Sequence, residues 1–168
     1  FNGGIEDCFP KEDRVLIPSP RVETYDKKPE MSAFELTNEL EKKIATNKYN
    51  FILTNFANPD MVGHTGNLRA TIKAIEVVDE CLGRIYKKCL DNNYILIVTS
   101  DHGNADVMYN KDDEIKCTTH SINPVPFIIC EKFKFLKNTG SLADIAPTIL
   151  KIMNIKTPEE MQGSCLIE

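Results

Sequence analysis

The stretch "YNFILTNFANPDMVGH", residues 49–64, places an apolar run directly before a polar segment that contains a proline. The run at 49–56 shows little polar alternation, which predicts a short strand buried on both faces. Asp60 and His64 follow it, four residues apart, where apolar partners are few. Either both side chains face water, or a carboxylate and an imidazole converge on a ligand. The rest of the chain decides between these two interpretations.

Similar apolar runs recur along the chain and predict further strands. They are "YILIVTS" at 94–100 and "VPFIIC" at 125–130, with "RVLIPSP" at 14–20 a shorter strand-like run. Continuous apolar strands separated by helices favour an α/β fold with a largely parallel β-sheet covered by helices on both faces. In such sheets ligands bind beyond the carboxyl ends of the strands.

Helical spacing of apolar residues predicts helices from Ser32 to about 46, from 68 to 90, and over 142–154. Ser32 with Glu35, and Ser141 with Asp144, have the spacing of N-terminal caps. The polar stretch 111–114 predicts a hairpin tip or irregular loop. From 155 onward the pattern indicates an irregular tail.

Composition limits the classes of function. The 168 residues fit one domain, and the net charge of −5 with scattered lysines disfavours a nucleic-acid or anionic membrane surface. No apolar run approaches the roughly 18 residues of a membrane span. Six cysteines without a CxxC pair indicate a reduced, cytoplasmic protein in which Cys89 and Cys130 pack as small hydrophobic groups. Because the chain begins at Phe1 without a methionine, we expect it to be a piece of a longer protein.

All three histidines, His64, His102 and His120, lie in polar loops near the expected strands. Taken singly, each has an ordinary interpretation as a chance spacing, a turn or a hydrogen-bonded loop histidine. Together with Asp60 and Asp101 they could meet at one rim of the sheet. Carboxylates and neutral imidazoles suit divalent ions such as Mn²⁺ or Zn²⁺. Five ligands would serve two ions roughly 4 Å apart that stabilise a phosphoryl group and its nucleophile.

At these residues the sequence resembles the cofactor-independent (2,3-bisphosphoglycerate-independent) phosphoglycerate mutases of the alkaline phosphatase superfamily. The resemblance runs nearly end to end, and its more specific parts are the "NGG" opening, "PSPRVETYDKKPEMSA" and "NPDMVGHTG". Further matching stretches are "TSDHGNAD" at 99–106, "THSINPVPF" at 119–127 and "GSLADIAPTIL" at 140–150.

The resemblance implies two divalent ions, with Mn²⁺ the first choice and Zn²⁺, Co²⁺ or Mg²⁺ as alternatives. It assigns Asp60, His64 and His120 to the first ion, and Asp101 and His102 to the second. It also implies that residues 1–168 are the C-terminal part of an alkaline phosphatase-like metal-binding domain, truncated at the N-terminus. The nucleophilic serine and an inserted transferase domain would lie outside this chain.

The activity implied is the interconversion of 3-phosphoglycerate and 2-phosphoglycerate through a phosphoserine, by a cytoplasmic monomer. We expect the chain alone to be inactive, because the nucleophile is not part of it. Two alternatives remain open. One is another phosphomutase or metal-dependent phosphohydrolase of the same superfamily, and the other is a non-catalytic interaction module on the same scaffold.

Overall fold

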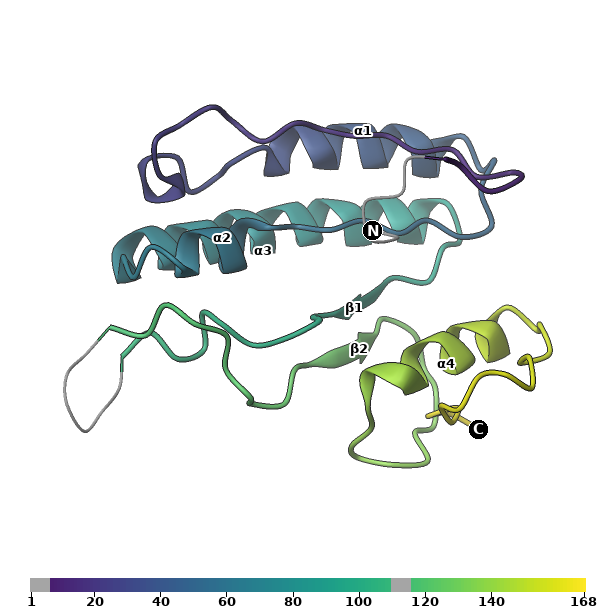
Figure 1. The fold of residues 1–168 in the computed structure, drawn as a ribbon. Coiled ribbons are helices and arrows are strands. Elements are labelled where there is room, and N and C mark those ends of the chain that lie inside the picture. The colour runs from purple at the N-terminus through teal and green to yellow at the C-terminus, as the bar shows by residue number, and fades with distance from the viewer. Residues whose placement is uncertain (1–6, 110–115) are drawn as a thin grey trace.

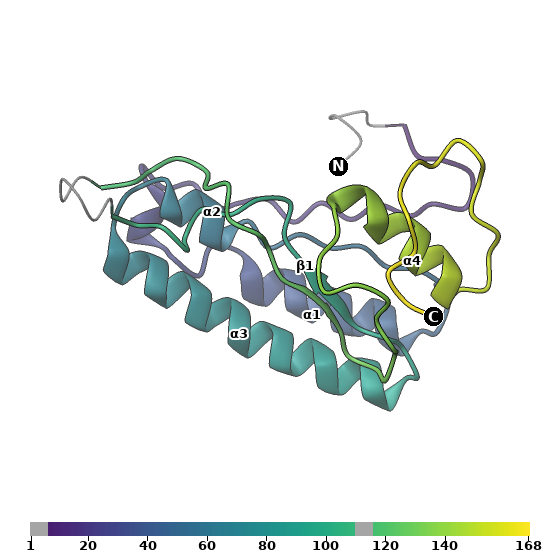
Figure 2. The same ribbon diagram turned by 90° about the horizontal axis from the view of Figure 1, so that it is seen from below.

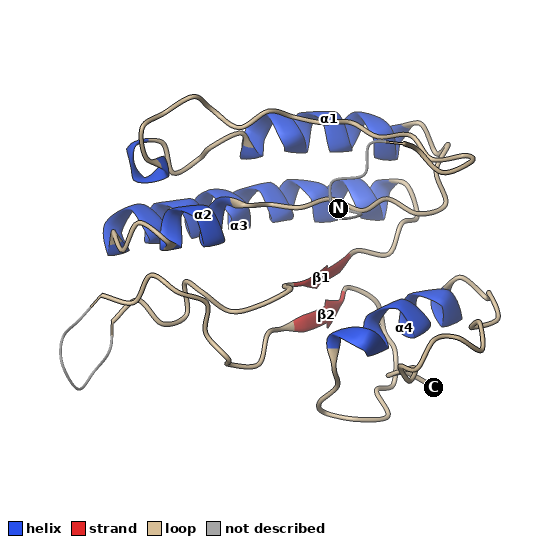
Figure 3. Ribbon diagram, in the orientation of Figure 1, coloured by secondary structure: helices blue, strands red, loops and turns tan. Residues whose placement is uncertain are grey.

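The computed structural model of the chain describes residues 7–109 and 116–168. Two long helices, α1 (Ala33–Ala45) and α3 (Leu68–Asp91), lie side by side and form a layer (Figures 1 and 2). The short α2 (Asn58–Gly63) packs on α3. A pair of short strands lies beside this layer, and the last helix stands apart from it (Figure 3). These remaining elements are η2 (Tyr25–Lys27), β1 (Ile97–Thr99), β2 (Phe127–Ile129), η3 (Leu142–Asp144) and α4 (Ile145–Ile152).

Asparagines flank α3 at both ends, and each uses its side chain in a hydrogen bond. The Asn67 side chain accepts a hydrogen bond from the backbone N–H of Ala70, which satisfies one of the free donors of the first turn. At the other end Asn92 donates to the carbonyl of Lys88, and Asn93 takes a positive φ of 58°. This left-handed conformation ends the helix and reverses the chain. Asparagine tolerates it better than most residues do.

The main apolar cluster joins α1, α3 and the chain segments that lead into the sheet. Its buried members are Leu40 and Ile44 from α1 and Ile85 and Cys89 from α3. Against them pack Ile52, Phe56, Tyr94 and Leu96. Burial raises the pKa of the Cys89 thiol, so this cysteine packs as a small apolar group, as expected. Cys130 is half-buried, and all six cysteines carry free thiols.

The predicted helices are confirmed, with one correction. Residues 33–45, 68–91 and 145–152 are helical, and Ser141 with Asp144 forms the expected capping box before α4. At α1 the expected capping box is wrong, because Ser32 makes no capping hydrogen bond. Its hydroxyl instead donates to the carbonyl of Pro18, which holds the preceding segment against the helix.

The predicted sheet is corrected in two respects. Of the expected strands, only parts of 94–100 and 125–130 form a ladder, and these two strands pair antiparallel. Residues 14–20 and 49–56 belong to no helix and to no strand ladder among the described residues. In the second of these segments Phe51 is 51% exposed and Leu53 60% exposed, so it is not buried on both faces.

The antiparallel pairing follows from the connection between the two strands. Ladder contacts at Thr99↔Phe127 and Gly103↔Ser121 belong to one long, interrupted hairpin. Between these two contacts the first arm has three residues, 100–102, and the second arm has five, 122–126. The second arm contains two prolines, which have no N–H to donate to a ladder. An antiparallel pair needs no crossover helix, and none occurs between the strands in the described residues.

Three further sequence predictions concern the loop at 111–114, the tail from 155 onward and membrane-spanning segments. The predicted loop or hairpin tip at 111–114 lies outside the described residues, although Tyr109 and Lys116 on either side form an antiparallel bridge. The tail from 155 onward is irregular, as expected, with one bridge between Phe135 and Ile167. Among the described residues no helix combines the length and hydrophobicity needed to cross a bilayer.

Truncation of Ile85 tests the contribution of the main cluster. This side chain is 2% exposed, and Ile85→Ala should lower the free energy of unfolding by about 2–5 kcal/mol through lost burial and a residual cavity. Ile75→Ala on the same helix is the matched control, because Ile75 is 44% exposed and should cost about 0.5 kcal/mol or less. Urea unfolding measures both changes, and equal values would contradict the assigned core.

The carboxylate of Asp144 should make the free energy of unfolding decrease at low pH. Hydrogen bonds from the backbone N–H of Ser164 and then of Ser141 hold the pKa of Asp144 below its ordinary value. The resulting stabilisation is complete above the unfolded-state pKa of about 3.9 and is lost as pH falls through the lower folded-state pKa. Asp144→Asn should therefore flatten the decline of the urea midpoint below about pH 4. A decline equal to that of the unsubstituted chain would contradict this role.

Candidate metal centre

Asp60 and His64 are brought to the same side of the chain by one turn of helix. Pro59 lies in the first turn of α2, where its missing N–H costs nothing, and His64 caps the C-terminal end. Residues four apart share a face of a helix, so the carboxylate and the imidazole are neighbours. Asn58 anchors the start of α2 by donating to the carbonyls of Pro29 and Glu30.

His120 joins this pair from the second arm of the hairpin. Its Nε2 lies 3.2 Å from His64 Nε2 and 3.2 Å from Asp60 Oδ1. His64 Nε2 also lies 3.2 Å from Asp60 Oδ1. We call these three atoms the donor triangle. Its three sides are equal, and residues 56 positions apart in the sequence contribute to it.

The tautomer of His64 follows from its other nitrogen. Nδ1 lies 2.6 Å from the carbonyl oxygen of Thr118, which can only accept, so Nδ1 carries the hydrogen. In the neutral ring Nε2 is then left with a free lone pair, directed at the triangle. A histidine that ligates a metal is commonly oriented by a hydrogen bond of this kind.

The donor triangle fits a single divalent ion. An equilateral triangle of this side has its corners about 1.9 Å from its centre, so a point slightly above the plane lies about 2.1 Å from all three atoms, a usual metal–nitrogen distance. One carboxylate and two imidazoles are donors of intermediate hardness. Asp60, His64 and His120 can therefore hold a metal on one side and leave positions open on the other.

The adjacent pair Asp101–His102 lies next to the triangle. The ring of His102 stacks on that of His120, with centroids 3.6 Å apart and planes 17° from parallel. His102 Nε2 lies 3.7 Å from Asp101 Oδ1, and the Asp101 side chain is 75% exposed. His102 Nδ1 is buried, has no hydrogen-bond partner among the described residues and lies 4.0 Å from Asp60 Oδ1. Four of the five expected ligand residues thus lie together, with Asp101 at the edge.

Two polar residues of the same loop were not singled out from the sequence. Asn104 donates to Asp60, and Asp106 accepts from Ser121 and from Asn123. The hydrogen bond from Asn123, followed by those from Ser121, holds the pKa of Asp106 below its ordinary value. Asp106 thereby connects the loop after His102 to the loop after His120. The run of polar residues in "DHGNAD" could have pointed to Asn104 and Asp106. The sequence does not reveal which residue each of these side chains contacts.

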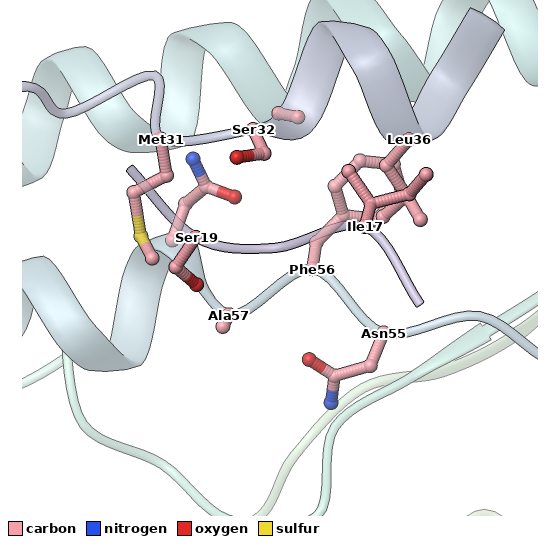
Figure 4. A pocket seen from close by; sticks show the side chains of 10 residues that line it. Ile17, Ser19, Met31, Ser32, Leu36, Asn55, Phe56 and Ala57 are labelled. Carbon is pink, nitrogen blue, oxygen red and sulfur yellow. The ribbon is translucent and has the colours of Figure 1, made fainter. Parts of the chain in front are cut away.

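A separate cavity lies away from these residues, between α1 and the segment that enters α2. It encloses about 200 Å³. Figure 4 shows Ile17, Leu36 and Phe56 at one end of the cavity, with Met31 and Ser32 at the other. No histidine or carboxylate lines it, so it offers none of the chemistry of the donor triangle.

Comparison with known proteins agrees with this chemistry. The family model described as "Metalloenzyme superfamily" matches residues 1–157, and the chain therefore belongs to this superfamily. Within it, the chain is 58% identical over 171 residues to the 2,3-bisphosphoglycerate-independent phosphoglycerate mutase of Antithamnion sp.. It is 54% identical over 169 residues to the mutase of the same name from Ehrlichia ruminantium (strain Gardel).

These relatives are longer than the chain. The matches cover 99% and 100% of the chain but only 33% and 34% of the two relatives, so the chain spans about a third of their length. A crystal structure of Leishmania mexicana phosphoglycerate mutase, obtained at low cobalt concentration, matches with a TM-score of 0.81 and 32% identity. That match covers 90% of this chain and 31% of the other. It confirms the α/β fold and the resemblance to these mutases.

Proposed function

We propose that this chain is the C-terminal part of the metal-binding phosphatase domain of a 2,3-bisphosphoglycerate-independent phosphoglycerate mutase. The whole protein would interconvert 3-phosphoglycerate and 2-phosphoglycerate, in glycolysis and gluconeogenesis. The observation that supports this most directly is the donor triangle, three ligand atoms each 3.2 Å apart. It occurs in a chain similar to such mutases over its whole length.

The proposed centre holds two divalent ions. Asp60, His64 and His120 would bind the first, and Asp101 with His102 would supply two ligands of the second. Carboxylate oxygens with imidazole nitrogens suit Mn²⁺ or Zn²⁺. The resemblance to the phosphoglycerate mutases makes Mn²⁺ the first choice, with Zn²⁺, Co²⁺ and Mg²⁺ as alternatives. When bound, the ions would stabilise negative charge on a phosphoryl group and activate an oxygen nucleophile.

The residues of this chain would bind and orient the reacting groups. The hydrogen bond from His64 Nδ1 to Thr118 fixes the tautomer of the neutral ring, so that the lone pair of Nε2 faces the centre. Stacking of His102 on His120 restricts the rotation of both rings. The serine that accepts the phosphoryl group, the inserted transferase domain and most contacts to the glycerate would belong to the remaining two thirds of the protein. Its domains would close on the glycerate and exclude water.

The remainder of the protein would also complete the sheet. Residues 51–56 lie in no ladder among the described residues. Phe51, Leu53, Ile95 and Ile128 are exposed apolar side chains. Strands from the other two thirds would pair with these segments and extend the sheet in the parallel sense. We further propose that the whole protein is a cytoplasmic monomer.

Metal binding tests the first ligand set. The 168-residue chain should bind Mn²⁺ with three protein ligands. His120→Ala removes one of these ligands and should weaken binding more than about 100-fold, which is the largest loss usual for a residue that only hydrogen-bonds a ligand. Thr119→Ala is the matched control because Thr119 is exposed and contributes no atom to the donor triangle. Titration calorimetry measures both affinities. An unchanged affinity in His120→Ala would contradict the ligand set.

Activity is best tested in a chimera. The chain should replace the corresponding third of the Antithamnion mutase, since the two are 58% identical there. We expect the chimera to convert 3-phosphoglycerate to 2-phosphoglycerate, and the chain alone to show no turnover above a metal-free blank. His64→Ala should reduce the rate of the chimera more than about 100-fold.

Other outcomes separate the alternatives. Release of inorganic phosphate without isomerisation would favour a metal-dependent phosphohydrolase. A folded chimera with neither activity would favour a non-catalytic module. Turnover by the chain alone would contradict the assignment of the nucleophile to the other two thirds.

A further inference from the structure

A buried amide lies directly behind the donor triangle. Asn104 is 6% exposed, and its Nδ2 lies 2.7 Å from Asp60 Oδ1 and 3.4 Å from the backbone oxygen of Asp60. Both oxygens can only accept while Asp60 is ionised, so the NH₂ group of Asn104 faces them. The oxygen that Asn104 contacts is the same Oδ1 that forms a corner of the triangle.

The other end of this amide is tightly confined. Asn104 Oδ1 is buried and has no hydrogen-bond partner among the described residues. It faces Gly63, where an added Cβ would lie only 2.5 Å from this oxygen. Leaving an amide oxygen without a partner costs free energy, and the hydrogen bond from Nδ2 to the Asp60 carboxylate offsets part of this cost. Gly63 also directly precedes His64, whose Nε2 is another atom of the donor triangle.

Asn104 connects the two sets of expected ligands. It follows His102 by two residues, on the loop that carries Asp101, and it contacts Asp60 on α2. We propose that Asn104 is a positioning residue that fixes the rotamer of Asp60 and so presets the first metal site against the loop of the second. This inference rests on the metal centre of the proposed function, but assigns a role to a residue that is not itself a ligand.

The physical basis is the restricted freedom of the carboxylate. One oxygen has two lone pairs, so Oδ1 can accept from Asn104 and still face a metal. Without this donor, Asp60 could rotate away from the histidines, and each binding event would have to restrict it again. Hydrogen-bond partners of metal ligands typically contribute 10–100-fold to metal affinity.

Asn104→Ala removes the donor and leaves all five proposed ligands in place. We expect this variant of the 168-residue chain to bind Mn²⁺ about 10–100-fold more weakly, measured by electron paramagnetic resonance of free Mn²⁺. Asn92→Ala is the matched control, because its amide also donates to a backbone carbonyl but lies at the far end of α3. That control should bind Mn²⁺ as the unsubstituted chain does.

Gly63→Ala tests the position of the amide while keeping it present. Gly63 has no positive φ and lies in α2, so alanine suits the backbone, and any change in the metal-free unfolding midpoint comes from displacing the buried amide. The added methyl group must displace the amide, because its nearest neighbour would be Asn104 Oδ1. We therefore expect weaker Mn²⁺ binding by the folded variant, measured well below its unfolding midpoint, where a purely structural role for Asn104 would leave binding unchanged.

The outcomes distinguish this inference from the proposed function. If the unsubstituted chain binds Mn²⁺ and His120→Ala abolishes binding, but Asn104→Ala and Gly63→Ala bind normally, the positioning role is overturned and the metal site stands. If the unsubstituted chain binds no Mn²⁺, the proposed metal site fails and the inference fails with it. Weaker binding by both variants, with Asn92→Ala unchanged, supports the role of Asn104.

Discussion

One oxygen atom, Oδ1 of Asp60, is the point on which the candidate centre depends. Three nitrogen atoms surround it: Nε2 of His64, Nε2 of His120 and Nδ2 of Asn104. They come from α2 and from both arms of the interrupted hairpin. A carboxylate that is partly withdrawn from water needs hydrogen-bond donors or a cation to offset its lost hydration. Asn104 supplies such a donor. The lone pair on His64 Nε2 does not, so this nitrogen and the carboxylate oxygen fit a cation between them.

The position of Asp60 depends in turn on the packing of α2. Val62, two residues further on, is fully buried against Ala70 and Ala74 of α3 and against Met31. This contact turns the opposite side of α2, with Asp60 and His64, toward the hairpin. The apolar cluster thus decides where the carboxylate points, and the polar contacts refine its orientation. A six-residue helix has little stability of its own, so its direction must come from such packing.

The sequence predicted the helices better than the sheet, for a physical reason. A helix carries its apolar stripe and its caps within a short segment, so the patterns at 33–45 and 68–91 suffice. A strand is defined by its neighbours, and an apolar run does not reveal which segment pairs with it. The runs at 49–56 and 94–100 looked alike in sequence, yet only the second lies in a ladder. The convergence of His64 and His120 was expected, whereas the contact of Asn104 with Asp60 required the folded chain.

The two-stranded sheet and the donor triangle depend on different contacts. The triangle is held by α2, by the bridge between Gly103 and Ser121, and by the hydrogen bonds of Asp106 to Ser121 and Asn123. None of these contacts involves β1 or residues 51–56. Gly103 permits the bridge, since an added Cβ there would meet Ser121 at 2.2 Å. Between the pair Thr99–Phe127 and the bridge Gly103–Ser121 the two arms are not paired. The second arm contains two prolines there, within 122–126. The break in the ladder frees Asp101 and His102 from strand geometry, so both side chains can turn toward the same side as His120.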